Sequence, residues 1–301
     1  MNTRKRGIFL RYEELSMIEK MVLKLTYCKG IGLIGKWKIV KFYEKFHAEK
    51  FFAEDVIQIA QINQYKGMFR DSFRSISDDW LQEKLQHQQY VTWLSPDYPQ
   101  ELLELPYPPL VIFYEGNLAL LEYPRLAFVG ARQSTNYSVQ VLHKLLPTIV
   151  KRRFVIVSGL AKGVDRMSHE IAIRSGGSTI GVVGCGLDIC YPREVTALFG
   201  EMKKNHLVLS EYPQGTGIKK HHFPMRNRII AGLSKATCVI EAKERSGSLI
   251  TAQLALDYGK DVFAIPGEIL TGQSDGCHRL IQDGAKCVIS VQDILEDLPD
   301  F

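Results

Sequence analysis

Four short segments rich in glycine and small polar residues each follow an apolar run of the sequence. The segments are Gly130–Ser134, Ser158–Asp165, Gly184–Asp188 and Arg245–Leu249, and the residues in them expected to bind a ligand are Gly130, Arg132, Ser158, Gly159, Lys162, Gly184, Gly186, Ser246, Gly247 and Ser248. Glycine lets the backbone approach a ligand closely, and free N–H groups at the start of a helix attract anions. Any tight strand-to-helix turn needs glycine, but four such turns together predict a rim that binds phosphate.

The spacing of these glycines differs from that of the common nucleotide-binding motifs. Gly184-Cys185-Gly186 is followed by Leu187, Asp188 and Ile189, so a G-x-G-x-x-G motif would lack its third glycine. The sequence also contains no G-x-x-x-x-G-K-S/T motif. These observations disfavour the usual NAD and ATP sites and leave an unconventional nucleotide site open. We therefore expect no cofactor.

The segment from Lys219 to Arg228 combines cations with one aromatic ring and contains no acid. Its residues expected to contact a ligand are Lys220, Phe223, Arg226, Asn227 and Arg228. This mixture suits a strand whose phosphates pair with cations and whose unpaired bases stack on a ring. The segment alone leaves open the alternative that Phe223 belongs to the core and the cations form a solvated face.

No set of residues for catalysis can be assembled from the sequence. Asp165 and His169 share one face of a predicted helix, either as an acid–base pair or, as we expect, through a structural hydrogen bond. Glu241, Glu244 and Asp188 follow strands without a nucleophile and base beside them. The six cysteines show no C-x-x-C spacing, so we expect free thiols and no metal site. Because no nucleophile and base can be paired, we expect no enzymatic activity.

Buried strands that alternate with helices are expected from about residue 110 onward. Short apolar runs, typical of strands covered on both faces of a parallel sheet, occupy 126–129, 154–157, 179–183, 207–209, 238–240 and 262–265. Helical patterns cover 138–151, 163–175 and 249–258. The pattern predicts an α/β fold with an extended Rossmann-like, doubly wound, mostly parallel sheet. The glycine segments then lie at the carboxyl ends of its strands.

Residues 1–92 are expected to form a small all-helical domain, because apolar residues recur at helical spacing from Met17 to Leu25. The turn Gly30–Gly35 resembles a helix-hairpin-helix, but a tight turn between packed helices explains it more simply. Prolines from Pro96 to Pro109 exclude a long helix. We therefore assign 93–109 to a proline-rich link and 110–301 to the Rossmann-like domain.

The chain has 301 residues and a net charge of +5, which permits a phosphate partner without requiring one. No apolar stretch approaches the roughly 20 residues of a membrane helix. The N-terminus is too briefly apolar for a signal peptide. We expect a cytoplasmic protein without a membrane partner.

Five segments together resemble the DNA-processing protein A family, also called DprA or Smf. They are Ser158–Asp165, Gly184–Asp188 with Tyr191 and Pro192, Ser210–Pro213, Phe223–Ser234 and Ser246–Ala252. The resemblance implies a Rossmann-like core that binds single-stranded DNA and forms a homodimer. It further implies delivery of incoming strands to the recombinase RecA during natural transformation, without catalysis.

The resemblance also implies particular contacts. The arginine and lysine that hold DNA phosphate in the family fall on Arg132 and Lys220, and the phenylalanine that contacts a base falls on Phe223. A basic residue after Tyr-Pro falls on Arg193. The glycine loops would donate backbone N–H groups to phosphates. Residues 1–92 look like the sterile-alpha-motif-type (SAM-like) helical domain of some members.

The sequence departs from the family pattern at three places. Ser138 follows Tyr137 where the family has glycine, Lys162 stands where arginine is common, and Val195 replaces a common asparagine. The departures leave the details of the Gly184 loop open, but not the fold. Many members carry a C-terminal winged-helix domain, which we expect this sequence to lack.

Two other interpretations remain. A Rossmann-fold enzyme that hydrolyses or transfers a nucleotide phosphoribosyl group shares the glycine loops but does not need the cation-aromatic segment at 219–228. A protein specific for duplex DNA through the Gly30–Gly35 turn would place the affinity in the N-terminal domain.

Overall fold

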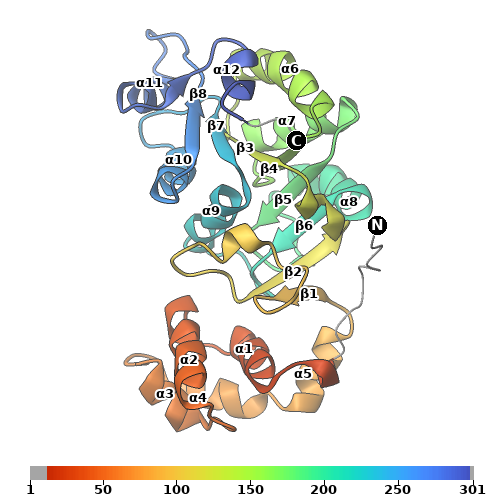
Figure 1. Ribbon diagram of the computed structural model, residues 1–301, viewed down its shortest axis with the longest axis vertical. Helices are drawn as coiled ribbons and strands as arrows, with labels where there is room; N and C mark the ends of the chain where they lie inside the picture. The colour runs from red at the N-terminus through yellow and green to blue at the C-terminus, as the bar shows by residue number, and fades with distance from the viewer. Residues whose placement is uncertain (1–11, 299–301) are drawn as a thin grey trace. The chain divides into compact units, whose positions relative to one another are not determined.

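The computed structural model describes residues 12–298 (Figure 1). By its internal contacts the chain divides into two compact units, Met1–Phe113 and Tyr114–Phe301. The extreme N-terminal residues that were assessed for a signal peptide lie outside the described residues. Within residues 12–298, no helix combines the length and the apolar character needed to cross a membrane.

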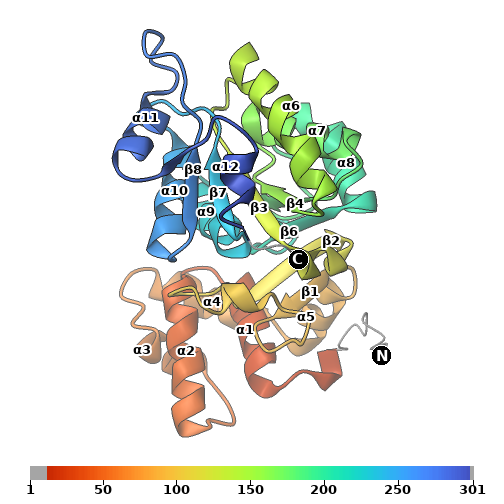
Figure 2. The same ribbon diagram turned by 45° about the horizontal axis from the view of Figure 1, so that its top comes forward.

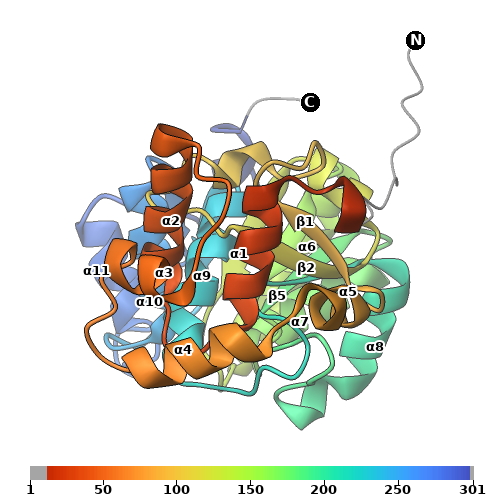
Figure 3. The same cartoon turned by 90° about the horizontal axis from the view of Figure 1, so that it is seen from below.

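The first unit is built mainly from helices (Figure 3). Its elements are η1 (Tyr12–Glu14), α1 (Met17–Tyr27), α2 (Leu33–Phe46), α3 (Ala53–Ile59), α4 (Lys66–Ser75), α5 (Asp78–Leu85), β1 (Gln89–Thr92), η2 (Gln100–Leu102) and the start of β2 (Val111–Gly116). The helix predicted from Met17 is confirmed, and Ser16 and Glu19 cap its start reciprocally. The expectation of helix throughout is wrong at Gln89–Thr92, where aromatic and β-branched residues form a strand.

The proline-rich segment is packed rather than open. Tyr98 is 2% exposed, and its hydroxyl donates a hydrogen bond to the carbonyl of Pro109 at 2.6 Å. The indole N–H of Trp37 in α2 donates to the carbonyl of Pro108 at 2.8 Å. Proline leaves its carbonyl free to accept, so these prolines end regular structure and still bond to their neighbours.

The second unit alternates strands and helices. Its elements are η3 (Leu118–Glu122), β3 (Arg125–Val129), α6 (Asn136–Lys151), β4 (Val155–Ser158), α7 (Val164–Arg174), β5 (Thr179–Val183), η4 (Arg193–Val195), α8 (Thr196–Asn205), β6 (Leu207–Ser210), α9 (His222–Leu233), β7 (Ala236–Val239), α10 (Gly247–Asp257), β8 (Asp261–Ala264), α11 (Asp275–Gln282), β9 (Lys286–Cys287) and α12 (Gln292–Leu295). Each of the six predicted strands and three predicted helices is confirmed within a few residues.

The strands of this unit lie in the order β6-β5-β4-β3-β7-β8-β9, and neighbouring strands are parallel. The chain moves outward from β3 in one direction through β4, β5 and β6, and then in the other through β7, β8 and β9. This arrangement is the predicted doubly wound, Rossmann-like sheet, and its order reverses between β3 and β7.

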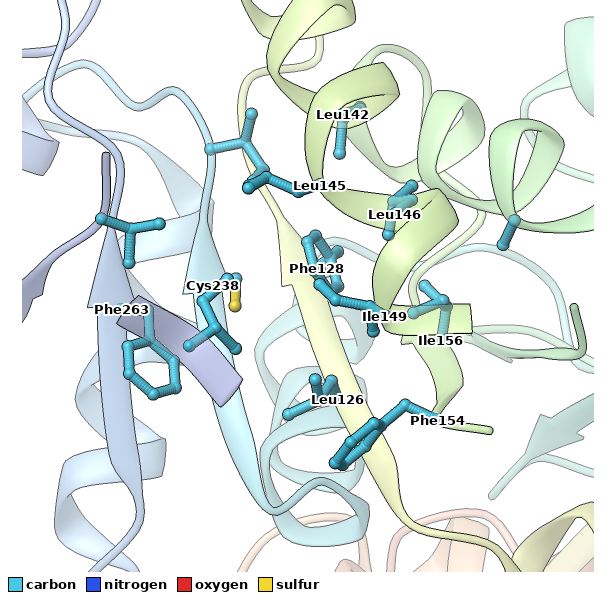
Figure 4. Close-up of a cluster of buried hydrophobic side chains, with 14 of the residues drawn as sticks. Leu126, Phe128, Leu142, Leu145, Leu146, Ile149, Phe154, Ile156, Cys238 and Phe263 are labelled. Atoms are coloured by element: carbon cyan, nitrogen blue, oxygen red, sulfur yellow. The ribbon is translucent and has the colours of Figure 1, made fainter. Parts of the chain in front are cut away.

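Helices cover both faces of the sheet (Figure 2). Helices α6 and α7 pack together on one face, and α9 and α10 pack together on the other. Figure 4 shows Leu126 and Phe128 of β3 beside Leu145 and Ile149 of α6 in the buried cluster. Because β3 is buried along its whole length, its carboxyl-end loop starts from a rigid base.

Candidate nucleic-acid interface

Four loops meet at the carboxyl edge of the second unit's sheet. They follow β5, β4, β3 and β7, which are consecutive neighbours in the sheet. All four predicted glycine segments therefore lie along one edge, because the strands are parallel and end on the same side. The loops come together at close range: a Cβ placed on Gly130 would lie 2.7 Å from a methyl carbon of Val164 at the start of α7.

A pocket of about 60 Å³ opens above the ends of β4 and β5. Arg132 from the loop after β3, Lys162 from the loop after β4, and Tyr191, Phe223 and Arg226 contribute to its lining. The guanidinium carbon of Arg132 lies 5.5 Å from the ring centre of Phe223, within the range of a cation–π contact. Two residues predicted from distant segments, Arg132 and Phe223, are thus brought together.

Helix α9 presents the cation-aromatic segment to this pocket. Lys220 is exposed just before the helix, and Phe223 lies in its first turn, where Pro224 is tolerated. His222 is buried, its Nδ1 lies 2.9 Å from the carbonyl oxygen of Gly184, and its ring stacks on Tyr212 at 3.9 Å. Burial lowers the pKa of His222, so the neutral ring donates this hydrogen bond. The start of α9 is thereby fixed to the loop after β5.

Arg226 lies under the pocket and is only 6% exposed. Its Nη1 donates to the carbonyl of Val182 at 2.9 Å, and its guanidinium lies directly against Gly159, where a Cβ would be 1.5 Å from Nη1. Burial lowers the pKa of Arg226, and the Asp165 carboxylate opposes that shift. No acceptor within residues 12–298 reaches its Nε. Arg226 therefore supplies buried positive charge to the pocket floor rather than an exposed contact.

The loop after β4 folds around the buried carboxylate of Asp165. Burial raises the pKa of Asp165, whereas the charge of Arg226 and the hydrogen bond from the Ala161 N–H lower it. The Ala161 N–H donates to this carboxylate at 3.4 Å. The Ser158 hydroxyl donates to the carbonyl of Phe128 at 2.6 Å. The Ser158 hydroxyl thus stabilises the loop, whereas Gly159 lines the pocket.

The glycines of the loop after β5 differ in what their backbone groups do. The carbonyl of Gly184 is bonded to His222, and the N–H of Gly186 donates to the carbonyl of Thr216 at 2.9 Å. A Cβ on Gly186 would lie 2.7 Å from the carbonyl oxygen of Pro213. The expected donation of the Gly186 N–H to phosphate conflicts with this geometry. Gly186 is needed because two loops approach closely there.

Three further predicted cations lie around this edge, and two of them pair with glutamate side chains. Lys162 pairs with the carboxylate of Glu194, and both side chains are half exposed. The neighbouring Arg193 is exposed at the start of η4. Arg228 is nearly buried and pairs with Glu211. Arg193 and Lys162 are therefore open to solvent, whereas Arg228 acts within the protein.

The loop after β7 forms the start of α10. Ser246 caps that helix by accepting from the Ser248 N–H, and the two hydroxyl oxygens are 2.7 Å apart. The side-chain amide of Asn227 donates to the carbonyl of Gly247 at 3.3 Å. This contact ties α9 to α10, so Asn227 joins two parts of the edge.

Glu241 occupies the point where the strand order reverses. It is 2% exposed, and its carboxylate accepts from the Thr135 N–H at 3.1 Å and from the Thr135 hydroxyl at 2.8 Å. A dinucleotide phosphate would lie at this crevice in a nucleotide-binding Rossmann fold. A buried carboxylate there repels phosphate, and it also holds the loop that carries Arg132.

The possible acid–base pair of Asp165 and His169 is not formed. His169 is fully buried, its Nδ1 contacts the Thr179 hydroxyl, and burial lowers its pKa to about 3. It is therefore a neutral structural residue. Residues 12–298 contain no group of three or more His, Cys, Asp or Glu side chains suited to a metal ion.

Sequence reasoning did not single out six residues that line the pocket: Ala161, Val183, Cys185, Tyr191, Pro192 and Ile218. Tyr191 lines it from the loop after β5, and its ring centre is 6.2 Å from that of Phe223. The Tyr-Pro pair was a signal that could have identified it. Ile218 also lines the pocket, and nothing in its sequence context distinguishes it.

Taken together, the fold and the edge define a Rossmann-like protein with an anion-attracting pocket lined by the exposed ring of Tyr191 and the half-buried ring of Phe223. The model of the family described as DNA recombination-mediator protein A matches residues 89–299. The chain belongs to this family.

Similar proteins agree with the family assignment. The DNA processing protein DprA of Streptococcus pneumoniae is 46% identical over 230 residues, covering 76% of this chain and 81% of that protein. Its X-ray structure superposes with a TM-score of 0.85 at 40% identity, covering 95% of this chain and 99% of the other. A structure of DNA processing protein A from Helicobacter pylori, described for its single-stranded DNA binding mode, gives a TM-score of 0.64 at 34% identity over 70% of this chain and 96% of that one.

Proposed function

We propose that this protein binds single-stranded DNA along the carboxyl edge of its second unit, without strong sequence preference. The observation that carries the proposal is the meeting of Arg132 and Phe223 at one pocket, with Lys220 exposed just before the same helix. The family relationship and the single-stranded DNA binding described for the Helicobacter pylori protein support it.

In this proposal the cations hold phosphates and the ring holds a base. Arg132 and Lys220 are exposed and present N–H donors to phosphate oxygens. Arg193 and Lys162 extend the positive charge along the rim, and Arg226 adds charge from below. Phe223 is half-buried, so part of its ring remains free to stack on a base that has no Watson–Crick partner. Contacts of these two kinds do not read the base sequence.

A small nucleotide fits this edge less well than a strand does. The pocket of about 60 Å³ is well below the roughly 300–1,000 Å³ of typical small-molecule sites. Glu241 lies buried where a dinucleotide phosphate would bind. These features speak against the phosphoribosyl-processing enzyme, and we propose that the protein has no catalytic activity.

We further propose that the protein acts in the cytoplasm as a homodimer and helps to load RecA onto the bound strand during natural transformation. The family description as a recombination mediator supports this role. Light scattering would measure the molar mass in solution and so test for the dimer. RecA ATPase activity on a strand coated with single-strand-binding protein would measure loading, and a rate unchanged by this chain would contradict it.

A titration with single strand, duplex and nucleotide at several salt concentrations tests the DNA proposal. We expect single strand to bind best and its affinity to fall with rising salt. Arg132→Ala and Lys220→Ala should each weaken binding to all sequences alike and reduce the slope of log K against log salt by about 0.7. Lys235→Ala is the matched control, because Lys235 is exposed at the opposite, amino-terminal edge of β7.

Three outcomes would refute the proposal. Tight nucleotide binding that single strand does not displace would favour the enzyme. Preference for duplex would move the site to the Gly30–Gly35 turn of the first unit. Wild-type affinity in both Arg132→Ala and Lys220→Ala would mean that the strand lies elsewhere.

A further inference from the structure

Tyr191 is an exposed aromatic residue at the mouth of the pocket. It comes from the loop after β5, whereas Phe223 comes from α9, 32 positions further along the chain. The ring of Tyr191 is 47% exposed and lines the pocket together with Phe223. Its hydroxyl makes no hydrogen bond within residues 12–298. Neither burial nor hydrogen bonding therefore explains an aromatic residue at this place.

The two rings leave a gap that is close to the thickness of a base. Their centres are 6.2 Å apart, and their planes are inclined by 44°. A base held between two parallel rings needs about 7 Å, twice the roughly 3.5 Å contact distance of carbon atoms. The gap must therefore widen by about 1 Å and the rings must turn toward parallel. Rotation of the exposed Tyr191 side chain about its own bonds can supply both changes.

Charge beside the gap fits the same ligand. The Arg132 guanidinium lies 5.5 Å from the Phe223 ring centre, and Arg193 follows Tyr191 by two residues. A nucleotide whose base enters the gap would carry its phosphate past these cations. The residues thus combine ring surface with positive charge, which is the chemistry of single-strand binding sites.

We infer that Tyr191 and Phe223 form a two-ring slit that holds one unpaired base of the bound strand. This inference rests on the proposed single-strand binding and assigns Tyr191 a direct contact with the ligand. The slit accepts any base, because every base has a flat face, but it does not accept a base paired in a duplex. Tyr191 would therefore contribute to the discrimination between single strand and duplex.

The test uses the full chain and fluorescence anisotropy with two labelled strands of equal length. One strand is an oligothymidylate, and the other carries abasic sites throughout, so it keeps the phosphates and has no bases. Tyr191→Ala should weaken binding of the first strand about 5- to 10-fold, near the low end of the effect of removing one stacking ring. It should not change binding of the abasic strand. The salt dependence should stay the same, because no cation is lost.

Two further variants distinguish the effect of ring stacking from that of apolar side-chain volume. Tyr191→Phe keeps the ring and should bind like the wild type, whereas Tyr191→Leu keeps apolar volume and should behave like Tyr191→Ala. Tyr123→Ala is the matched control, because Tyr123 is 46% exposed and precedes the opposite end of the sheet at β3. Thermal unfolding should show the same midpoint for all four variants within about 2 °C.

The outcomes distinguish this inference from the proposed function. If the wild type binds oligothymidylate and Tyr191→Ala binds equally well, the slit does not exist and the proposed function stands. An equal loss on both strands would also overturn the slit, because it would show that Tyr191 only positions the cations. If the wild type fails to bind oligothymidylate at all, the proposed function itself fails.

Discussion

Replacing Gly159 by alanine tests how the pocket floor is built. The added Cβ would lie 1.5 Å from Nη1 and 2.3 Å from Cζ of Arg226, so the guanidinium must leave its place. Its hydrogen bond to the carbonyl of Val182 would then break, and Asp165 would lose the cation that offsets its buried charge. Leaving a buried hydrogen-bonding group without its partner costs about 1–3 kcal/mol. We expect the free energy of unfolding of Gly159→Ala to fall by that amount.

The same substitution should weaken DNA binding. Arg226 belongs to α9, which also carries Phe223, so its displacement disturbs the floor and the ring together. Urea denaturation measures the stability, and strand binding should be measured at a temperature where the variant is still folded. Gly200→Ala is the matched control, because Gly200 lies inside α8 and a Cβ added there would meet no atom within 4 Å. That change should stabilise the protein by about 0.5–1 kcal/mol.

A double mutant makes the prediction specific. In an Arg226→Met background, Gly159→Ala should cost much less than in the wild type, because the charged group that must be displaced is already gone. Wild-type stability of Gly159→Ala would refute the placement of Arg226 against Gly159. If the stability losses of Gly159→Ala and Arg226→Met simply add in the double mutant, the clash with Arg226 is not the cause of the loss.

Three other predictions follow from contacts around the edge. Glu241→Ala leaves the Thr135 N–H and hydroxyl without their acceptor, so the free energy of unfolding should fall by about 1–3 kcal/mol. Strand affinity should fall as well, and Glu241→Gln should show smaller losses of both. His169 has a folded pKa of about 3 against about 6.5 unfolded, so it should cost about 2 kcal/mol of stability between pH 6.5 and pH 5, a loss that His169→Gln should reduce in urea titrations. Glu194→Gln releases Lys162 from an exposed ion pair and should raise strand affinity and its salt dependence, with little change in stability because solvent screens the pair.

Each of these predictions has an opposite result that would contradict it. Unchanged strand affinity in a folded Glu241→Ala variant would mean that the loop after β3 does not depend on this carboxylate. The same pH dependence in His169→Gln and the wild type would assign the titration to another group. Burial sets the direction of the pH dependence for His169, because the unfolded chain binds the proton more tightly than the folded protein does. The free energy of unfolding is therefore undiminished well above pH 6.5 and falls as the pH is lowered. Weaker strand binding by Glu194→Gln would show that the ion pair helps to place Lys162.

The sheet was predictable because its evidence is local. The runs at 126–129 and 238–240 are apolar throughout, and a strand covered on both faces needs that composition. The proline-rich segment was harder, since proline patterns report only the absence of long helix. The burial of Tyr98 beside Pro109 depends on packing that no short stretch of sequence encodes.

For the cations of residues 219–228, the sequence pattern could not predict which side chains are exposed and which are buried. The sequence alone determined that this segment mixes positive charge with one ring and that the glycine segments follow strands. Only the tertiary structure decided which cations face solvent. Helix α9 packs against both the sheet and α10, so Arg226 and Arg228 are buried with partners while Lys220, before the helix, stays exposed.

The pocket itself is a product of the tertiary structure. Arg132, Tyr191 and Phe223 come from three loops or helix starts that parallel strands bring to one edge. Each residue type was visible in the sequence, and two of the three were singled out there. The distances between the three residues could not be predicted from the sequence. They depend on how far each loop extends past its strand and on the buried groups, such as Asp165 and Glu241, that hold those loops in place.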